Sequence, residues 1–545
     1  MADDPHAIVR RYHEATKHHQ HRYASSLGYL DWATQPHPFR RFEGAPLLEL
    51  PFPESDEAAA FDAVYDGAAE LRPVGVGTIA RLFYFSMALS AWKQQGDSRW
   101  ALRVNPSSGN LHPTEAYLVA GVVPDCSKGP AVFHYAPDVH GLEHRAELDT
   151  ALPEGVMLIV LTSIHWREAW KYGERAYRYC QHDAGHALAA IRLSAGLLGW
   201  SVRLLTAAPR RDLAALVGVD RDDGGHRHEP EVADMALLLE TRRGGPPCPW
   251  NGEEIASLTV ARFHGVANRL SHEHHPWPII DEVERAVNAG ARPDSEAMWS
   301  DGGAPVPCHT VAPPSVTTDA SALIRRRRSA VAMDGRTGMT ASTFFRMLAR
   351  TLPLAACRPW DAIPWAPRVH LGLFVHRVEG LAPGLYVLAR NDEHVDALQA
   401  SMHESFSWCR VPAAPAWLPC YLLAAMDIRD LARTVSCHQD IAADGAFGAG
   451  MLAWFDPVLN ARGPACYPQL FWETGAIGQV LYLEAEAAGL RATGIGCFFD
   501  DAVHEIFGLR GRSFQSLYHF TVGRPVDDTR ITTLPAYDRT DRTGQ

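Results

Sequence analysis

The stretch His182-Asp-Ala-Gly-His-Ala-Leu-Ala-Ala-Ile-Arg-Leu-Ser-Ala-Gly-Leu-Leu-Gly199 returns in altered form 290 positions later as Trp472-Glu-Thr-Gly-Ala-Ile-Gly-Gln-Val-Leu-Tyr-Leu-Glu-Ala-Glu-Ala-Ala-Gly489. Both copies have the spacing of a long helix and end on a glycine, which is typical of a C-terminal cap. The same register continues without a gap and pairs Gly185 with Gly475, Leu193 with Leu483, Ala195 with Ala485, Gly199 with Gly489, Leu213 with Val503, Leu216 with Ile506 and Gly218 with Gly508. A register this long predicts an internal duplication.

The length of the chain also favours two domains, because 545 residues exceed what one ordinary core contains. Gly244–Pro249 and Asp301–Pro314 are rich in glycine and proline, and between them Glu253–Leu270 and Ile279–Val287 have helical spacing. We therefore predict a first half at residues 1–250, a helical connector at 251–315 and a second half at 316–545.

Strand candidates occur in both halves and are interleaved with helices. They are Ala116–Val123, Val156–Thr162, Met235–Leu239, Val369–His376, Pro419–Ala425 and Tyr518–Val522. This alternation predicts an α+β fold made of α/β sandwich domains.

Composition excludes several classes of protein. The net charge of −12 argues against a nucleic-acid partner, and Arg325–Arg328 is the one strong basic cluster, either a solvated patch or a binding element. No run reaches the roughly 18–20 apolar residues of a membrane span, and the N-terminus lacks a signal-peptide pattern, so we expect a cytoplasmic protein without a membrane partner. The ten cysteines form no C-x-x-C pair, and no metal site is predicted.

The most distinctive string is Arg103-Val-Asn-Pro-Ser-Ser-Gly-Asn-Leu-His-Pro-Thr-Glu-Ala-Tyr117. Its turn is rich in hydroxyls, exposed amides and a carboxamide, which can grip a planar hydrogen-bonding ring or a phosphate. The same residue types also make ordinary turns at the start of a strand. Taken alone, the string leaves both interpretations open.

This string resembles the flavin-contacting turn of the nitroreductase superfamily, in its SagB-type azoline dehydrogenase branch. The stretch Trp166–His186 is similar to the part of that branch that holds a catalytic Lys-Tyr pair, here Lys171 and Tyr172. The resemblance implies an FMN cofactor contacted from the first half by Arg103, Pro106, Ser107, Ser108 and Asn110.

The second half resembles the superfamily in other places. Arg325–Ala330 is similar to the Arg-Arg-Ser start of these domains, Thr493–Cys497 to a loop that presents a backbone N–H to flavin N5, and Val522–Pro525 to the terminal strand that returns a basic side chain. Guanidinium groups suit a phosphate, and glycines let backbone approach a ring. The residues implied are Arg327, Arg328, Ser329, Gly494, Ile495, Gly496 and Arg524.

Each half lacks what the other keeps. Leu204 and Thr206 stand where the second half has Gly494 and Gly496, and the second half has Ala362–Leu371 in place of the Pro-Ser-Ser-Gly-Asn turn. In homodimeric nitroreductases the flavin lies between subunits, with the two groups of residues on different chains. We therefore expect an intramolecular pseudo-dimer with about one FMN per chain, for which a monomer suffices.

Three functions remain open. The first is a dehydrogenase that oxidises a small or peptide-derived, azoline-like substrate by hydride transfer to flavin N5, with Lys171 as base and Tyr172 as relay. The second is an NAD(P)H-dependent reductase of nitro compounds or quinones, and the third a non-catalytic scaffold. Lys171 could instead pair with Glu168 or Glu174 on a helix surface.

Other chemically active residues fit no closed set. The histidines and Cys437 do not have metal-ligand spacing, and Cys497 is either redox-active or packed. Ser436–Phe447 opens a helix where the counterpart of the Lys-Tyr segment is expected. There, Gln439, Asp440 and Asp444 either line the substrate cavity or cap the helix.

Overall fold

The computed structural model describes residues 4–53, 59–66, 69–222, 229–242, 247–289, 318–353 and 357–537. Residues 290–315 of the expected connector, including Asp301–Pro314, lie outside these ranges, as do residues 244–246 of the first glycine- and proline-rich stretch. Among the described residues, no helix has the length and apolar character that crossing a membrane requires.

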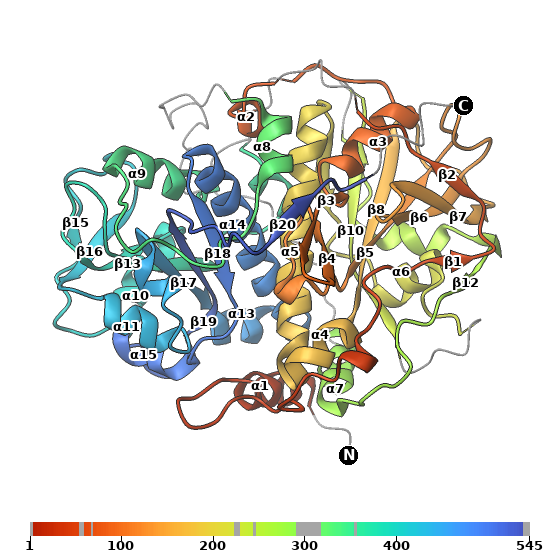
Figure 1. Cartoon of the computed structure of the whole chain (residues 1–545). Helices are drawn as coiled ribbons and strands as arrows, with labels where there is room; N and C mark the ends of the chain where they lie inside the picture. The colour runs from red at the N-terminus through yellow and green to blue at the C-terminus, as the bar shows by residue number, and fades with distance from the viewer. Residues whose placement is uncertain are drawn as a thin grey trace.

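Each half is built around an antiparallel sheet (Figure 1), and six strands of each sheet follow the same order. The first runs β11 (Val260–Phe263), β7 (Gly141–Leu148), β6 (Ala131–Ala136), β5 (Thr114–Ala120), β8 (Val156–Ile164), β10 (Glu231–Glu240) and β9 (Ser201–Leu204), with β2 (Leu47–Glu49) also on β7. The second runs β15 (Cys409–Arg410), β16 (Cys420–Ala425), β14 (Gly384–Leu388), β13 (Val369–Val375), β17 (Phe447–Trp454), β19 (Phe514–Gly523) and β18 (Arg491–Ile495). The predicted strands all fall in these sheets, and the α+β prediction is confirmed.

The helices repeat as well. In the first half they are α4 (His165–Tyr172), α5 (Ala176–Leu197) and α6 (Arg210–Val217), and in the second α13 (Phe455–Arg462), α14 (Tyr467–Ala487) and α15 (Asp500–Phe507). The caps Gly218 and Gly508 have left-handed φ angles of 74° and 67°. Since the bounds of α4 and α6 recur 290 positions later, the duplication is confirmed.

The counterpart of the Lys-Tyr segment was placed wrongly. It is α13, where Ala461 and Arg462 stand at the positions of Lys171 and Tyr172. Ser436–Phe447 instead forms a turn, the short helix α12 (Ile441–Asp444) and the start of β17. The sequence misled because α13 has kept no Lys-Tyr pair to mark it.

The halves meet where α5 crosses α14, in the middle of the molecule (Figure 1). A Cβ on Gly185 would collide with the carbonyl oxygen of Trp472, and a Cβ on Gly475 would collide with the carbonyl oxygen of His182. These four residues are the duplicated pairs at the 290-residue offset. The contact is thus symmetric, as at the two-fold axis of a homodimer, and it requires glycine on both sides.

Two hydrophobic layers bury each sheet. Along β8, Met157, Ile159 and Leu161 face the large shared core that contains α5 and α14, while Leu158 and Val160 face a smaller cluster with α6. The second sheet is covered on its outer face by a third cluster, which contains α15 and α10 (Val395–Ser401). Alternate side chains of a strand point to opposite faces of the sheet. Because both faces are buried here, successive residues of these strands are hydrophobic.

The terminal segments cross to the other half. From α1 (Pro5–Ala15), Arg10 forms an ion pair of 2.9 Å with Asp456 on α13. Near the C-terminus, β20 (Thr532–Leu534) pairs with β3 (Leu89–Gln95), which also pairs with β4 (Ser98–Arg103). These exchanges bind the halves into one unit, as the pseudo-dimer prediction requires.

The predicted helix at Glu253–Leu270 is wrong, whereas the one at Ile279–Val287 is confirmed as α7 (Pro278–Ala289). The former contains the short 3-10 helix η4 (Glu253–Ser257), β11 and β12 (Val266–Ala267), and β12 pairs with β1 (Phe42–Glu43). Gly265 between the two strands has a φ of 72°, which breaks a helix and suits a turn.

We predict that Gly185→Ala destabilises the protein by about 3 kcal/mol, because the added methyl group forces the α5 and α14 backbones apart. Urea unfolding followed by circular dichroism measures the change. Gly77→Ala is the matched control, since a Cβ at Gly77 in α3 (Val76–Tyr84) meets nothing within 4 Å. Equal stability of the two variants would contradict a tight helix crossing.

Candidate functional site

A cavity of about 640 Å³ lies between the two halves. It is lined by residues from both, including the predicted set Arg103, Pro106, Ser107, Ser108, Asn110, Tyr172, Arg327, Arg328, Ser329, Gly494, Ile495 and Gly496. These residues lie far apart in the sequence, and folding brings them to one place. Of the predicted set, Lys171 and Arg524 do not line the cavity walls.

The turn of the first half is held against α5. Ser108 donates from its backbone N–H and from its hydroxyl to Asp183, each at 3.1 Å, and the Ser107 hydroxyl accepts from the backbone N–H of His112 at 2.8 Å. Gly109 and Asn110 have positive φ angles of 60° and 58°, which glycine and asparagine tolerate best. The turn is therefore fixed before any ligand binds.

The Lys-Tyr pair ends α4 and lies against that turn. A Cβ on Gly109 would be 2.6 Å from the Tyr172 hydroxyl oxygen and 3.2 Å from Lys171 Nζ, so both polar groups meet the backbone there. Among the described residues Lys171 forms no ion pair, and the alternative pairing with Glu168 or Glu174 is not observed. Burial raises the pKa of Tyr172 well above its usual value, which keeps the phenol protonated.

Two arginines form the cationic end of the cavity. Arg327 is buried, donates through Nη2 to the carbonyl oxygens of Arg103 and Val104, and has no carboxylate partner among the described residues. Its Nε is buried without a hydrogen-bond partner. Burial, with Arg327 and Arg325 nearby, lowers the pKa of Arg328 to about 9. Cations buried without anions favour a ligand that carries negative charge.

Tyrosine side chains pack against the glycine-rich end of β18, at Gly494 and Gly496. A Cβ on Gly494 would collide with the hydroxyl of Tyr518, and one on Gly496 with the ring of Tyr179. The hydroxyl of Tyr482 on α14 accepts from the N–H of Gly494 at 3.0 Å and lies 2.9 Å from the Ser329 hydroxyl. Only glycine fits at these two positions of the wall.

Arg524 does not reach the cavity. Its side chain is exposed, and its carbonyl oxygen accepts from the N–H of Asp334 at 3.0 Å. Two other cations line the cavity instead and were missed: Lys93 on β3, whose Nζ donates to Thr533 at 2.7 Å, and Arg491, which pairs with Asp527. Neither residue belongs to a motif. Lys93 is held in place by the pairing of β3 with β20, which is distant in the sequence.

A buried pair of carboxyl groups lies behind the turn. Burial raises the pKa of Asp183 to about 7, and burial with the nearby Asp183 raises the pKa of Glu168 well above its usual value. Both oxygens of Glu168 are buried without a hydrogen-bond partner among the described residues. The pair can therefore hold a proton next to Ser107 and Ser108, a feature that sequence spacing did not indicate.

Gln439 lines the cavity, as one of the two interpretations of Ser436–Phe447 expected. Its Nε2 donates to the carbonyl oxygens of Ser436 at 2.8 Å and Cys497 at 3.1 Å. Asp440 precedes α12 without a side-chain capping bond, and neither it nor Asp444 lines this cavity.

The pseudo-symmetric position has different residues. Leu204 and Thr206 replace the two glycines, and Arg192 stands at the position of Tyr482, where its Nε donates to Asp361 at 2.8 Å. Asp361 belongs to η6 (Trp360–Ala362), which precedes β13 as η2 (Ser108–Asn110) precedes β5. A cavity of about 920 Å³ lies against Leu204–Thr206 but includes no residue of η6.

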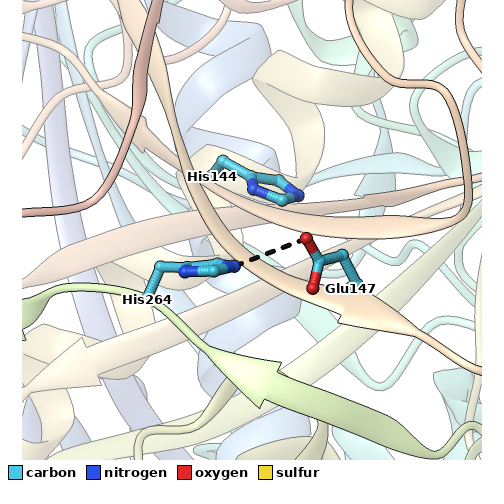
Figure 2. Close-up of side chains that lie close together, drawn as sticks. All are labelled: His144, Glu147 and His264. Atoms are coloured by element: carbon cyan, nitrogen blue, oxygen red, sulfur yellow. Dashed lines mark ion pairs between the residues drawn. The ribbon is translucent and has the colours of Figure 1, made fainter.

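One group among the described side chains has the geometry to hold a metal ion, and it lies outside both cavities. Figure 2 shows His144, Glu147 and His264, whose ligand atoms lie within 4.8 Å of one another. His264 Nε2 is 3.5 Å from a carboxylate oxygen of Glu147. Sequence spacing does not indicate this group, because His264 comes from a distant stretch and is brought to it by the pairing of β11 with β7.

Solved structures of other proteins align with all or part of this chain. A candidate nitroreductase from Anabaena variabilis has the same fold along its length, with a TM-score of 0.64, 21% identity, and coverage of 95% of this chain and 99% of that one. A candidate nitroreductase from Ralstonia eutropha aligns with 40% of this chain and 98% of its own, at 14% identity and a TM-score of 0.27. A chain of the Escherichia coli microcin synthetase McbBCD complex aligns with 44% of this chain and 94% of its own, at 16% identity and a TM-score of 0.27.

No curated protein matches the sequence. The nitroreductase family model matches twice, at residues 94–226 and at residues 385–524. These two matches cover half of the chain and fall on the two sheets described above. The chain therefore has the fold of the nitroreductase family of oxidoreductases, in two copies, and belongs to that family.

Proposed function

We propose that the chain binds one FMN in the cavity between its halves and uses it to oxidise a small or peptide-derived substrate. The observation that carries the proposal is the position of Arg327. This buried cation has no carboxylate partner among the described residues, and it lies in one cavity with the first-half turn and the second-half glycine strand. That combination provides both a phosphate site and a wall that backbone atoms can approach.

The residues present fit the cofactor. Arg327 and Arg328 would hold the phosphate, since both are cationic, poorly compensated and adjacent to the Ser329 hydroxyl. Gly494 and Gly496 present backbone rather than side chains to the cavity, and the turn Ser107–Asn110 lines it as well. Bound FMN would supply the hydride acceptor that no amino-acid side chain provides.

The proposed roles of Lys171 and Tyr172 rest on their positions and on the charge state of Tyr172. Tyr172 is held as a neutral phenol, so it can donate a hydrogen bond but is a poor base at neutral pH. Lys171 Nζ lies next to the same turn without an ion pair among the described residues, and a neutral amine accepts a proton far better than a phenol does. In this arrangement Lys171 removes a proton from the substrate, and Tyr172 orients the atom that loses it.

The alternative functions predict different behaviour. An NAD(P)H-dependent reductase of nitro compounds or quinones would need the same flavin but no base at Lys171, and a scaffold would need neither. The uncompensated arginines disfavour a scaffold, because burying such cations without a ligand costs free energy. The placement of Lys171 and Tyr172 at the end of α4, against the fixed turn, favours the dehydrogenase.

We predict that Arg327→Gln raises the Kd of FMN roughly 10- to 100-fold and leaves the Kd of riboflavin unchanged, because riboflavin lacks the phosphate. Fluorescence titration of the apoprotein measures both constants and the stoichiometry. Arg326→Gln is the matched control, since Arg326 is exposed, pairs with Glu486 and does not line the cavity. Equal losses for both ligands, or two tightly bound FMN per chain, would overturn the proposed site.

We predict that Lys171→Met and Tyr172→Phe slow anaerobic bleaching of the flavin by an azoline peptide by about 10²- to 10⁴-fold, with FMN affinity unchanged. Lys128→Met and Tyr29→Phe, both at exposed positions, are the matched controls. Stopped-flow absorbance gives the rates. If NADPH bleaches the wild-type flavin rapidly and the azoline peptide does not, the reductase is the correct assignment.

A further inference from the structure

Two cysteines meet at the wall of the cavity. Cys497 follows the glycine strand and lines the cavity, and its Sγ is 2.6 Å from Sγ of Cys437, which follows α11 (Arg429–Val435). Both side chains are partly exposed. A disulfide has an S–S distance of about 2.05 Å, so a displacement of roughly 0.5 Å separates this pair from a covalent bond.

The backbone at Cys437 is held in an unfavourable conformation. Cys437 and the next residue, His438, have φ angles of 53° and 58°, a left-handed region that costs roughly 1–3 kcal/mol per non-glycine residue. The side chain of Gln439 ties this turn to the strand end, because its Nε2 bonds the carbonyl oxygens of Ser436 and Cys497. Ordinary packing of two thiols requires neither the left-handed backbone nor the bonds from Gln439.

The surroundings favour the thiolate of Cys497. The adjacent thiol of Cys437, the ring of His18 and the guanidinium of Arg175 together lower the pKa of Cys497, against the opposing effect of burial. His18 Nδ1 accepts from the N–H of Ala24 at 2.9 Å, which leaves Nε2 as the donor. Arg175 is fixed by Asp500 at 2.9 Å and by the carbonyl oxygen of Gly496.

We propose that Cys497 and Cys437 form a redox-active dithiol that exchanges with low-molecular-weight disulfides. The Cys497 thiolate attacks one sulfur of the small disulfide, so that a mixed disulfide forms and one small thiolate leaves. Cys437 then loses its proton and attacks Sγ of Cys497, which forms the Cys437–Cys497 disulfide and releases the second small thiol. The cysteine pair loses two electrons, and the small disulfide gains them.

This proposal does not depend on FMN or on the oxidation proposed above, since neither enters the exchange. It gives the N-terminal segment a chemical role, because His18, whose backbone N–H donates to Asp500 of the second half, helps to lower the pKa of Cys497. It also places a disulfide in the wall of the cavity, beside Gly496.

The first test exposes the full-length protein to oxidised glutathione and maps its peptides by mass spectrometry. We expect a Cys437–Cys497 disulfide that dithiothreitol reverses. Cys437→Ser should stop the exchange at a glutathione adduct on Cys497, and Cys497→Ser should prevent both products at Cys437. Absence of the Cys437–Cys497 disulfide in the wild-type protein would overturn the proposal, and that outcome needs no variant to fold.

The second test compares rates of alkylation by iodoacetamide at pH 6. Cys497 should react roughly tenfold faster than Cys409, an exposed thiol that serves as internal control, because more of it is thiolate. His18→Gln should reduce this advantage, since the ring no longer stabilises the thiolate. Reaction of Cys497 no faster than Cys409 would contradict an activated thiol.

Discussion

The crossing of α5 and α14 at Gly185 and Gly475 is the contact on which the rest of the molecule depends. Because neither position accepts a Cβ, the two backbones touch and fix the distance between the sheets. That distance also bears on the cavity, because Asp183 on α5 and Tyr482 on α14 both line it. The two segments that exchange between halves, α1 and β20, then hold the same orientation from the outside.

A symmetric crossing generates two equivalent positions, yet the residues at them differ. One has glycines and Tyr482 around a cavity, and the other has Leu204, Thr206 and an Arg192–Asp361 ion pair. In a homodimer one sequence must serve both positions, so such a division is impossible. A fused chain removes that constraint, and each half is free to keep only the elements that one site uses.

Sequence could predict what is local or repeated. The ungapped register revealed the duplication, and the turn at Pro106–Asn110 was found because its residue types are consecutive. It could not place α13, whose Ala461 and Arg462 carry no signal, nor the Asp183–Glu168 pair, whose raised pKa values come from burial. The sequence could not predict the Cys437–Cys497 contact either. These residues meet where Gln439 ties the turn after α11 to the end of β18. The expectation for Arg524 rested on resemblance alone, and the side chain lies outside the cavity.

The charge distribution in the cavity separates its two ends. Arg327 is a buried cation and Arg328 a half-buried one, and both favour an anion, whereas Tyr172, Asp183 and, behind the turn, Glu168 have pKa values raised by burial and favour protonated forms. A ligand lying between these ends experiences positive charge at one end and proton donors at the other. His186 also lines the cavity, and because burial lowers its pKa to about 3, it stays neutral and adds no charge. Lys171 Nζ and the Tyr172 hydroxyl both lie at Gly109 of the turn that Asp183 holds, so the same carboxyl group positions the proposed base and the phenol proposed to orient the substrate.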